Sequence, residues 1–144
     1  MTLEELDEIL PNGLHDAQIK SLTHDYEKAT VKLVVGILVG LPDDAPQDRS
    51  RYRDAEIVLS RVLFCSVELP KDERSLRHQG SIWFVFNKMQ ADFLPTNLKN
   101  SIPPEFLCYS LYVIGWGSEI HIAASDVSFS WTDIGEVPVA ESIC

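Results

Sequence analysis

Two His-Asp dipeptides, His15-Asp16 and His24-Asp25, lie near the start of the chain, and His121 lies near its end. Imidazole and carboxylate groups are common metal ligands and common proton carriers in acid–base catalysis. Neighbouring residues of a strand point to opposite faces, so the two members of each dipeptide cannot readily bind one ion. The chain has no His-x-His or His-Glu-x-x-His spacing. We therefore expect no bound metal and no other cofactor.

Covalent catalysis also lacks a recognisable motif. There is no Gly-x-Ser-x-Gly elbow and no glycine-rich phosphate loop, and the three cysteines, Cys65, Cys108 and Cys144, are widely spaced. This pattern is typical of a reduced cytoplasmic protein rather than a disulfide framework. The interpretation leans away from an enzyme. One alternative stays open, a small-ligand or enzymatic site inside the fold that uses His15, Asp16, His24, Asp25 and His121.

The elements that must position these groups begin with one short helix. Thr2 can cap its start, and Glu5 stands at the capping-box position three residues later. Leu3, Leu6, Ile9 and Leu10 recur at helical spacing, and Pro11-Asn12-Gly13 ends the pattern. The sequence therefore predicts a helix from Thr2 to Leu10.

The remainder of the chain has the period-two alternation of strands. It is clearest from Val31 to Val39 and again from Val127 to Trp131. Predicted strands cover residues 16–26, 29–39, 55–69 (bent near Ser60-Arg61), 80–88, 106–114 and 119–131. We predict a mainly β protein in which a bent antiparallel sheet closes towards a barrel or sandwich, with a short N-terminal helix. The domain is single: residues 1–11 are the helix and its cap, 14–131 the β core and 132–144 an acidic tail.

Charge is distributed unevenly along the 144 residues. The net charge of −10 divides into −7 for residues 1–48, +3 for residues 49–99 and −6 for residues 100–144. An acidic chain is a poor match for nucleic acid, and its apolar runs are too short to cross a membrane. If the two acidic ends meet in space, they form a negative face that attracts a basic partner.

Trp116 stands between two glycines at a predicted hairpin tip. Such a ring can serve as an anchor for a partner, or it can fold back and cover the open end of the sheet. In the first case its polar rim would come from acidic side chains of the neighbouring loop and strand, namely Asp43, Asp44, Asp48 and Glu119.

Three short segments, Leu10 to Ala17, Val62 to Cys65 and Ile120 to Ala124, resemble a group of small uncharacterised bacterial proteins. That group is similar to the immunity proteins of bacterial polymorphic toxin systems, which are small, acidic and non-catalytic. The resemblance implies a cytoplasmic, non-catalytic binding domain that meets a basic protein partner through an acidic face. We expect a monomer or a homodimer formed through an edge strand.

Overall fold

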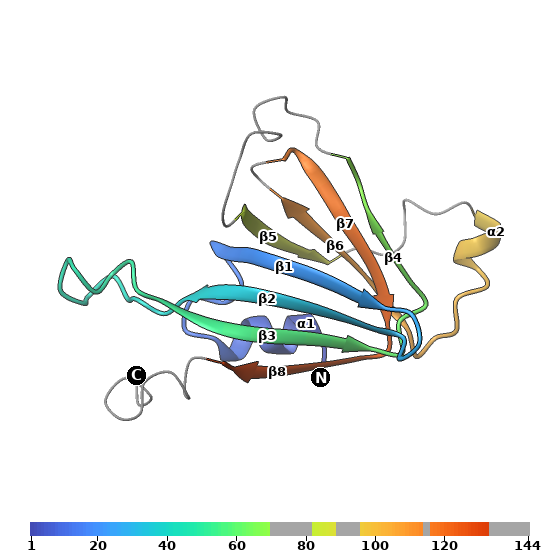
Figure 1. Cartoon of the computed structure of the whole chain (residues 1–144), viewed down its shortest axis with the longest axis horizontal. Helices are drawn as coiled ribbons and strands as arrows, with labels where there is room; N and C mark the ends of the chain where they lie inside the picture. The colour runs from blue at the N-terminus through green and yellow to red at the C-terminus, as the bar shows by residue number, and fades with distance from the viewer. Residues whose placement is uncertain (70–81, 89–95, 114–115, 133–144) are drawn as a thin grey trace.

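The computed structural model describes residues 1–69, 82–88, 96–113 and 116–132, with the backbone alone at 82–88, 98 and 99. These residues contain two helices, α1 (Leu3–Ile9) and α2 (Thr96–Lys99) (Figure 1). They also contain eight strands: β1 (Ala17–Asp25), β2 (Thr30–Leu38), β3 (Tyr52–Ser60), β4 (Phe64–Val67), β5 (Ile82–Lys88), β6 (Leu107–Val113), β7 (Ser118–Ala124) and β8 (Asp126–Trp131).

Local side-chain contacts define α1 and the turn that follows it. The Thr2 hydroxyl accepts a hydrogen bond from the Glu5 N–H at 3.1 Å, as the predicted cap requires. After the helix, Gly13 has a φ of +63°, and the Asp7 carboxylate accepts from the Leu14 N–H at 2.6 Å. A Cβ at position 13 would lie 2.6 Å from that carboxylate oxygen, so only glycine fits this turn.

The eight strands form one antiparallel sheet in the order β4-β7-β6-β5-β1-β2-β3-β8. In β2 every second side chain from Val31 to Ile37 is buried, and Gly36 between the last two of them is buried as well. A register shift in β1 falls between Ile19 and Ser21 and leaves Lys20 as the extra residue of a bulge. As a result, Ile19 before the bulge and Leu22 after it both pack in the apolar core.

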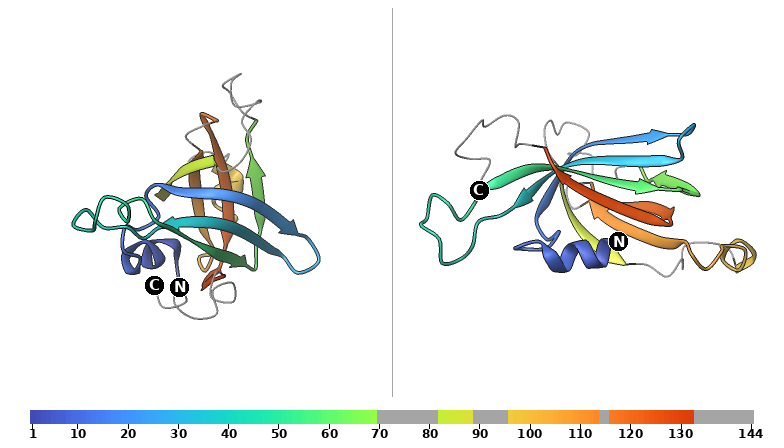
Figure 2. Two further views of the ribbon diagram at one scale, coloured as in Figure 1. Left: turned by 60° about the vertical axis from the view of Figure 1, so that its left-hand side comes forward. Right: turned by 90° about the horizontal axis from the view of Figure 1, so that it is seen from below.

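Two bends divide the sheet into a first half (β1, β2, β3, β8) and a second half (β4, β5, β6, β7). One bend lies between β3 and β4, where Arg61 has a φ of +53°, and the other lies at Ser125 between β7 and β8. The Ser125 N–H donates to the Ser60 carbonyl at 3.2 Å, so the two bends are adjacent. The two halves therefore run at a large angle to each other (Figures 1 and 2).

The apolar core lies between the two halves, with α1 packed against it (Figure 2). Leu3 and Leu6 of α1, Leu33 of β2, Ile57 of β3 and Ile122 of β7 are each at most 1% exposed. The predicted mainly β class with a bent antiparallel sheet and a short N-terminal helix is confirmed.

Two predicted strands are each divided by one of the bends. The long segment 55–69 breaks into β3 and β4 near the expected position, and the segment 119–131 breaks into β7 and β8 at Ser125. Apart from Thr132, the predicted acidic tail lies outside the described residues, and the single-domain assignment stays a prediction. Within the described chain, neither helix has the length and apolar character needed to cross a membrane.

Candidate functional site

The first candidate is a group of carboxylates on α1 and at the start of β8. Because α1 buries Leu3 and Leu6, its glutamates Glu4, Glu5 and Glu8 lie outside the core. The helix contains no Lys or Arg. We call Glu4, Glu5, Glu8 and Asp126 the acidic surface.

Asp126 joins this group because the N-terminus pairs with the start of β8. The Met1 ammonium lies 3.1 Å from the Asp126 carboxylate, and the Val127 N–H donates to the Met1 carbonyl at 3.1 Å. The hydrogen bond from the ammonium, its positive charge and a bond from the Val127 N–H lower the pKa of Asp126 below its ordinary 3.8. Asp126 at the start of β8 therefore lies beside the start of α1, with its carboxylate paired to the Met1 ammonium.

Tyr109 of β6 contacts the first turn of α1. Its side chain is buried, and its hydroxyl accepts a hydrogen bond from the Leu3 N–H at 3.4 Å. Burial is the main cause that raises the pKa of Tyr109 above 10.0, and the negative charges of Glu4, Glu5 and Asp126 add to it. The bond from the Leu3 N–H places the first turn of α1, which carries Glu4 and Glu5, against β6.

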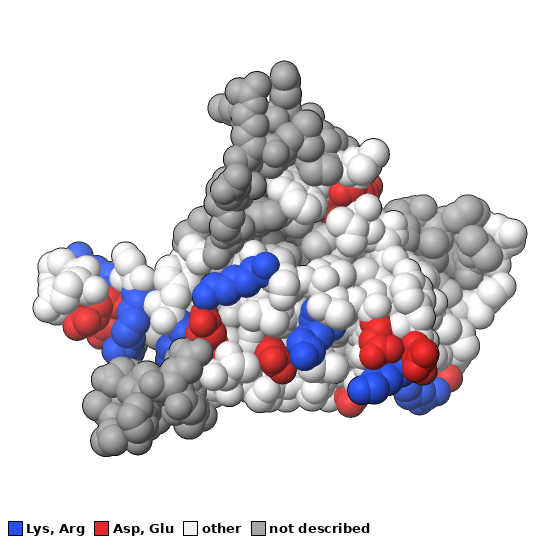
Figure 3. Space-filling view, in the orientation of Figure 1, with Lys and Arg blue, Asp and Glu red and all other residues white. Residues whose placement is uncertain are grey.

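On the outer face of β1, β2 and β3, acidic side chains pair with lysines. Lys20 pairs with Asp54, and Lys32 lies 3.9 Å from Glu56. Blue and red side chains are accordingly interspersed over this face (Figure 3). The face carries ion pairs, not a negative patch.

The loop between β2 and β3 carries Asp43, Asp44 and Asp48, which the sequence analysis assigned to the rim of a partner site. The Asp44 carboxylate accepts from the Leu41 N–H at 2.8 Å, and its carbonyl accepts from Arg49 at 3.0 Å. The loop extends from one end of the first half, away from the β6–β7 turn (Figure 1). These aspartates are therefore not brought together with Trp116.

Trp116 packs against the apolar core and is partly buried. It lines a cavity of about 250 Å³ whose other walls include Ile19, Leu22, Val113 and Ile120. The ring therefore packs on the core, as in the second of the two arrangements expected from the sequence, and its role as a partner anchor stays a prediction.

The residues of the alternative ligand pocket occupy three separate places. His15 and Asp16 lie 3.5 Å apart just before β1, and both are largely exposed. At the far end of β1, His24 stacks on Tyr26 and Asp25 accepts from the Lys28 N–H at 3.1 Å. His121 lies on β7 beside Glu68 and Glu119. Among the described residues, these five do not surround one pocket.

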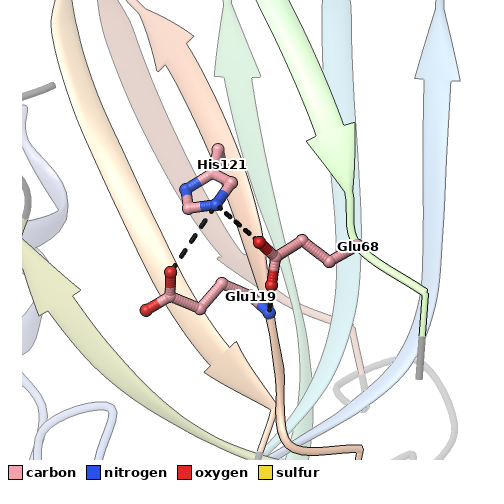
Figure 4. A group of neighbouring side chains, drawn as sticks. All are labelled: Glu68, Glu119 and His121. Atoms are coloured by element: carbon pink, nitrogen blue, oxygen red, sulfur yellow. Dashed lines mark hydrogen bonds and ion pairs between the residues drawn. The ribbon is translucent and has the colours of Figure 1, made fainter. Parts of the chain in front are cut away.

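His121 instead forms a cluster with two glutamates (Figure 4). Its Nε2 lies 3.6 Å from the Glu119 Oε2 and 3.6 Å from the Glu68 Oε2. The imidazole is 6% exposed, whereas the two carboxylates are about one-third exposed. One potential ligand atom from each residue falls within 4.8 Å of the others. We call these three residues the His121 cluster.

The sequence signal for this cluster was incomplete. Glu119 and His121 stand two apart on a strand, a spacing that places both side chains on one face. Glu68 joins them only because β4 pairs with β7 from Phe64↔Ala123 to Val67↔Ile120, which brings position 68 beside Glu119. Register between distant strands cannot be read from local alternation.

Comparisons with known proteins add little. No family model and no curated protein matches the chain. One solved structure, that of an uncharacterised protein from Neisseria gonorrhoeae, aligns with a TM-score of 0.43 and 12% sequence identity. The alignment covers 81% of this chain and 91% of that one.

Proposed function

We propose that this protein is a non-catalytic binding protein whose acidic surface binds a basic protein partner, in the manner of an immunity protein. One observation carries the proposal: the pairing of Met1 with the start of β8 places the Asp126 carboxylate beside the first turn of α1, which contains Glu4 and Glu5. Carboxylates held on a folded element steer a cationic partner and discriminate against acidic ones.

The position of Glu8 supports this proposal. Glu4 and Glu5 stand in the first turn of α1, where the helix dipole favours a carboxylate. Glu8 is in the last turn, where the dipole disfavours one by about 0.3–1 kcal/mol. Helix stability therefore explains the first two glutamates but not the third.

The described cysteines are poor nucleophiles, which favours binding over covalent catalysis. Burial raises the pKa of the Cys65 and Cys108 thiols above 9.0. Thiol catalysis requires the opposite shift, because the thiolate is the reactive form.

The proposal can be tested with the product of the gene that adjoins the one for this protein. In an immunity pair this neighbour encodes the basic partner, and the two proteins form a complex whose affinity falls as salt rises. We expect the triple variant E4Q/E5Q/E8Q to weaken the complex at least tenfold, mostly through a slower association rate.

A matched control removes the same charge from the β2–β3 loop, as D43N/D44N/D48N. That variant should bind within about twofold of the wild type, because its charges lie away from the acidic surface. The proposal fails if the neighbouring product does not bind, or if both triple variants bind as the wild type does. A loss confined to the loop variant would move the partner site to the loop.

A further inference from the structure

We propose that Glu68, Glu119 and His121 bind one divalent transition-metal ion of the Zn²⁺ class. The inference does not depend on the proposed partner, because the His121 cluster and the acidic surface share no residue. It rests on the geometry of the three side chains and on a buried hydroxyl beside them.

The ligand atoms already converge. Two ligands bound tetrahedrally to zinc at about 2.0–2.1 Å from the ion lie about 3.3–3.4 Å apart. The imidazole Nε2 stands 3.6 Å from each carboxylate oxygen, within a few tenths of an ångström of that separation, and the three atoms all lie within 4.8 Å of one another. The Nε2 faces the space between the two carboxylates (Figure 4).

A backbone hydrogen bond holds the Glu68 carboxylate in place. The Glu119 N–H donates to the Glu68 Oε1 at 2.8 Å, which leaves the Glu68 Oε2 directed at His121. The Glu68 N–H donates in turn to the Glu119 carbonyl at 3.0 Å. Such bonds to a ligand carboxylate are the outer-shell contacts that orient metal ligands.

Ser110 is a buried polar side chain next to the His121 cluster. It stands directly opposite His121 in the β6–β7 register, so the two side chains share one face of the sheet. Ser110 is 1% exposed, and its hydroxyl has no hydrogen-bond partner among the described residues. A buried hydroxyl left in this state costs about 1–3 kcal/mol. A water bound to the metal would supply the partner.

The donor set indicates which ion fits. Two carboxylates beside a neutral imidazole give a charge of −2, which a divalent cation neutralises. An imidazole ligand favours zinc, copper, iron or nickel over Mg²⁺ and Ca²⁺, which prefer oxygen donors alone. With three protein ligands, the fourth tetrahedral position is left for water, the arrangement found at open zinc sites.

The competing explanation is an ion pair between a protonated His121 and the two glutamates. A titration of the EDTA-stripped full chain with Zn²⁺ separates the two. We expect one Zn²⁺ per chain, a higher Tm in its presence, and no displacement by excess Mg²⁺. The absence of saturable binding to the wild type would overturn the metal site and leave the ion pair.

Two variants of similar exposure locate the ion. E119Q removes a carboxylate of the cluster, and E56Q removes one from the first half; both side chains are 33% exposed. We expect E119Q to lower Zn²⁺ affinity at least tenfold and E56Q to leave it unchanged. Equal affinities in the two variants would place the ion elsewhere and overturn the assignment.

A measurement on the wild type does not rely on the variants folding. Paramagnetic Cu²⁺, which belongs to the class of ion that an imidazole ligand favours, broadens NMR signals of nuclei near its site, so the amides of Ser110, Glu119 and His121 should broaden first. Broadening confined to other residues would contradict the proposed site. The acidic-surface variant E4Q/E5Q/E8Q should show the wild-type broadening pattern. Metal binding and partner binding can therefore fail independently of each other.

Discussion

The outer faces of the two sheet halves differ in how far their polar side chains are exposed to solvent. On the first half, Lys20, Asp54, Lys32 and Glu56 form exposed pairs over β1, β2 and β3. On the second half, the corresponding face buries Ser110, His121 and Ala123, all at most 5% exposed. Polar groups on the first face can use water, whereas those on the second must find partners within the protein. Chemistry that depends on desolvated groups is therefore expected on the second half.

The largest expected effect comes from placing a new charge on the buried outer face of the second half. Ala123 of β7 is fully buried and lies in a cluster with Cys108, Phe64 and Ile102. We expect A123D to lower the free energy of unfolding by about 3–5 kcal/mol, because it leaves an uncompensated buried charge. Urea denaturation of the stripped protein measures this change.

S128D is the control on the first half. Ser128 is exposed on β8, where water solvates a carboxylate, so we expect a change within about 0.5 kcal/mol. Comparable losses in the two variants would show that the two outer faces do not differ in burial.

A smaller effect is expected from the Ser110 hydroxyl. In the metal-free protein, S110A should raise the free energy of unfolding by about 1 kcal/mol, because it removes a buried hydroxyl that has no partner in the described chain. In the presence of Zn²⁺ the gain should shrink, since the same hydroxyl then bonds the metal-bound water. Chemical denaturation with and without Zn²⁺ gives both values.

S130A on the exposed side of β8 provides the comparison and should change stability by less than about 0.5 kcal/mol. A loss of stability in S110A without metal would mean that the hydroxyl already has a strong partner. The inference from Ser110 to a ligand would then be wrong.

The contrast between the halves also explains what could be predicted from the sequence. One face of β2 is more exposed than the other, so the buried residues from Val31 to Val35 alternate with the less buried Lys32 and Val34, and the strand was evident from the sequence. In β7 almost every position is buried, so alternation could not show whether the His121 side chain lies on the core face or the outer face of the strand. The fold class followed from local patterns, and the helix cap at Thr2 followed from capping chemistry.

The candidate sites depended on long-range pairing. Glu68 reaches His121 through the β4–β7 register, and Asp126 reaches α1 through the Met1 backbone. Local patterns in the sequence assign His121 and Glu119 to different candidate sites. They do not establish that the two acidic ends of the chain meet, because nothing local determines which strand the N-terminus contacts.

The smallest effect is expected from the Met1–Asp126 pair, which represents the exposed ion pairs of the first half. The pKa of Asp126 is lower in the folded protein than its ordinary 3.8. Its contribution to stability is therefore fully present above that value and is lost as the pH falls through the lower folded pKa. A series of Tm measurements from pH 6 to pH 2 should show a small extra decline below pH 4 that D126N lacks.

Added salt distinguishes the exposed Met1–Asp126 pair from the buried charge introduced by A123D. Because Asp126 is exposed, 1 M NaCl should remove most of the difference in Tm between the wild type and D126N at pH 6. The same salt should leave the difference between wild type and A123D in place, because burial of an uncompensated charge is not screened in this way. A D126N difference that resists salt would mean that the pair is shielded from solvent. The acidic surface would then be a buried contact of the fold and not a surface open to a basic partner.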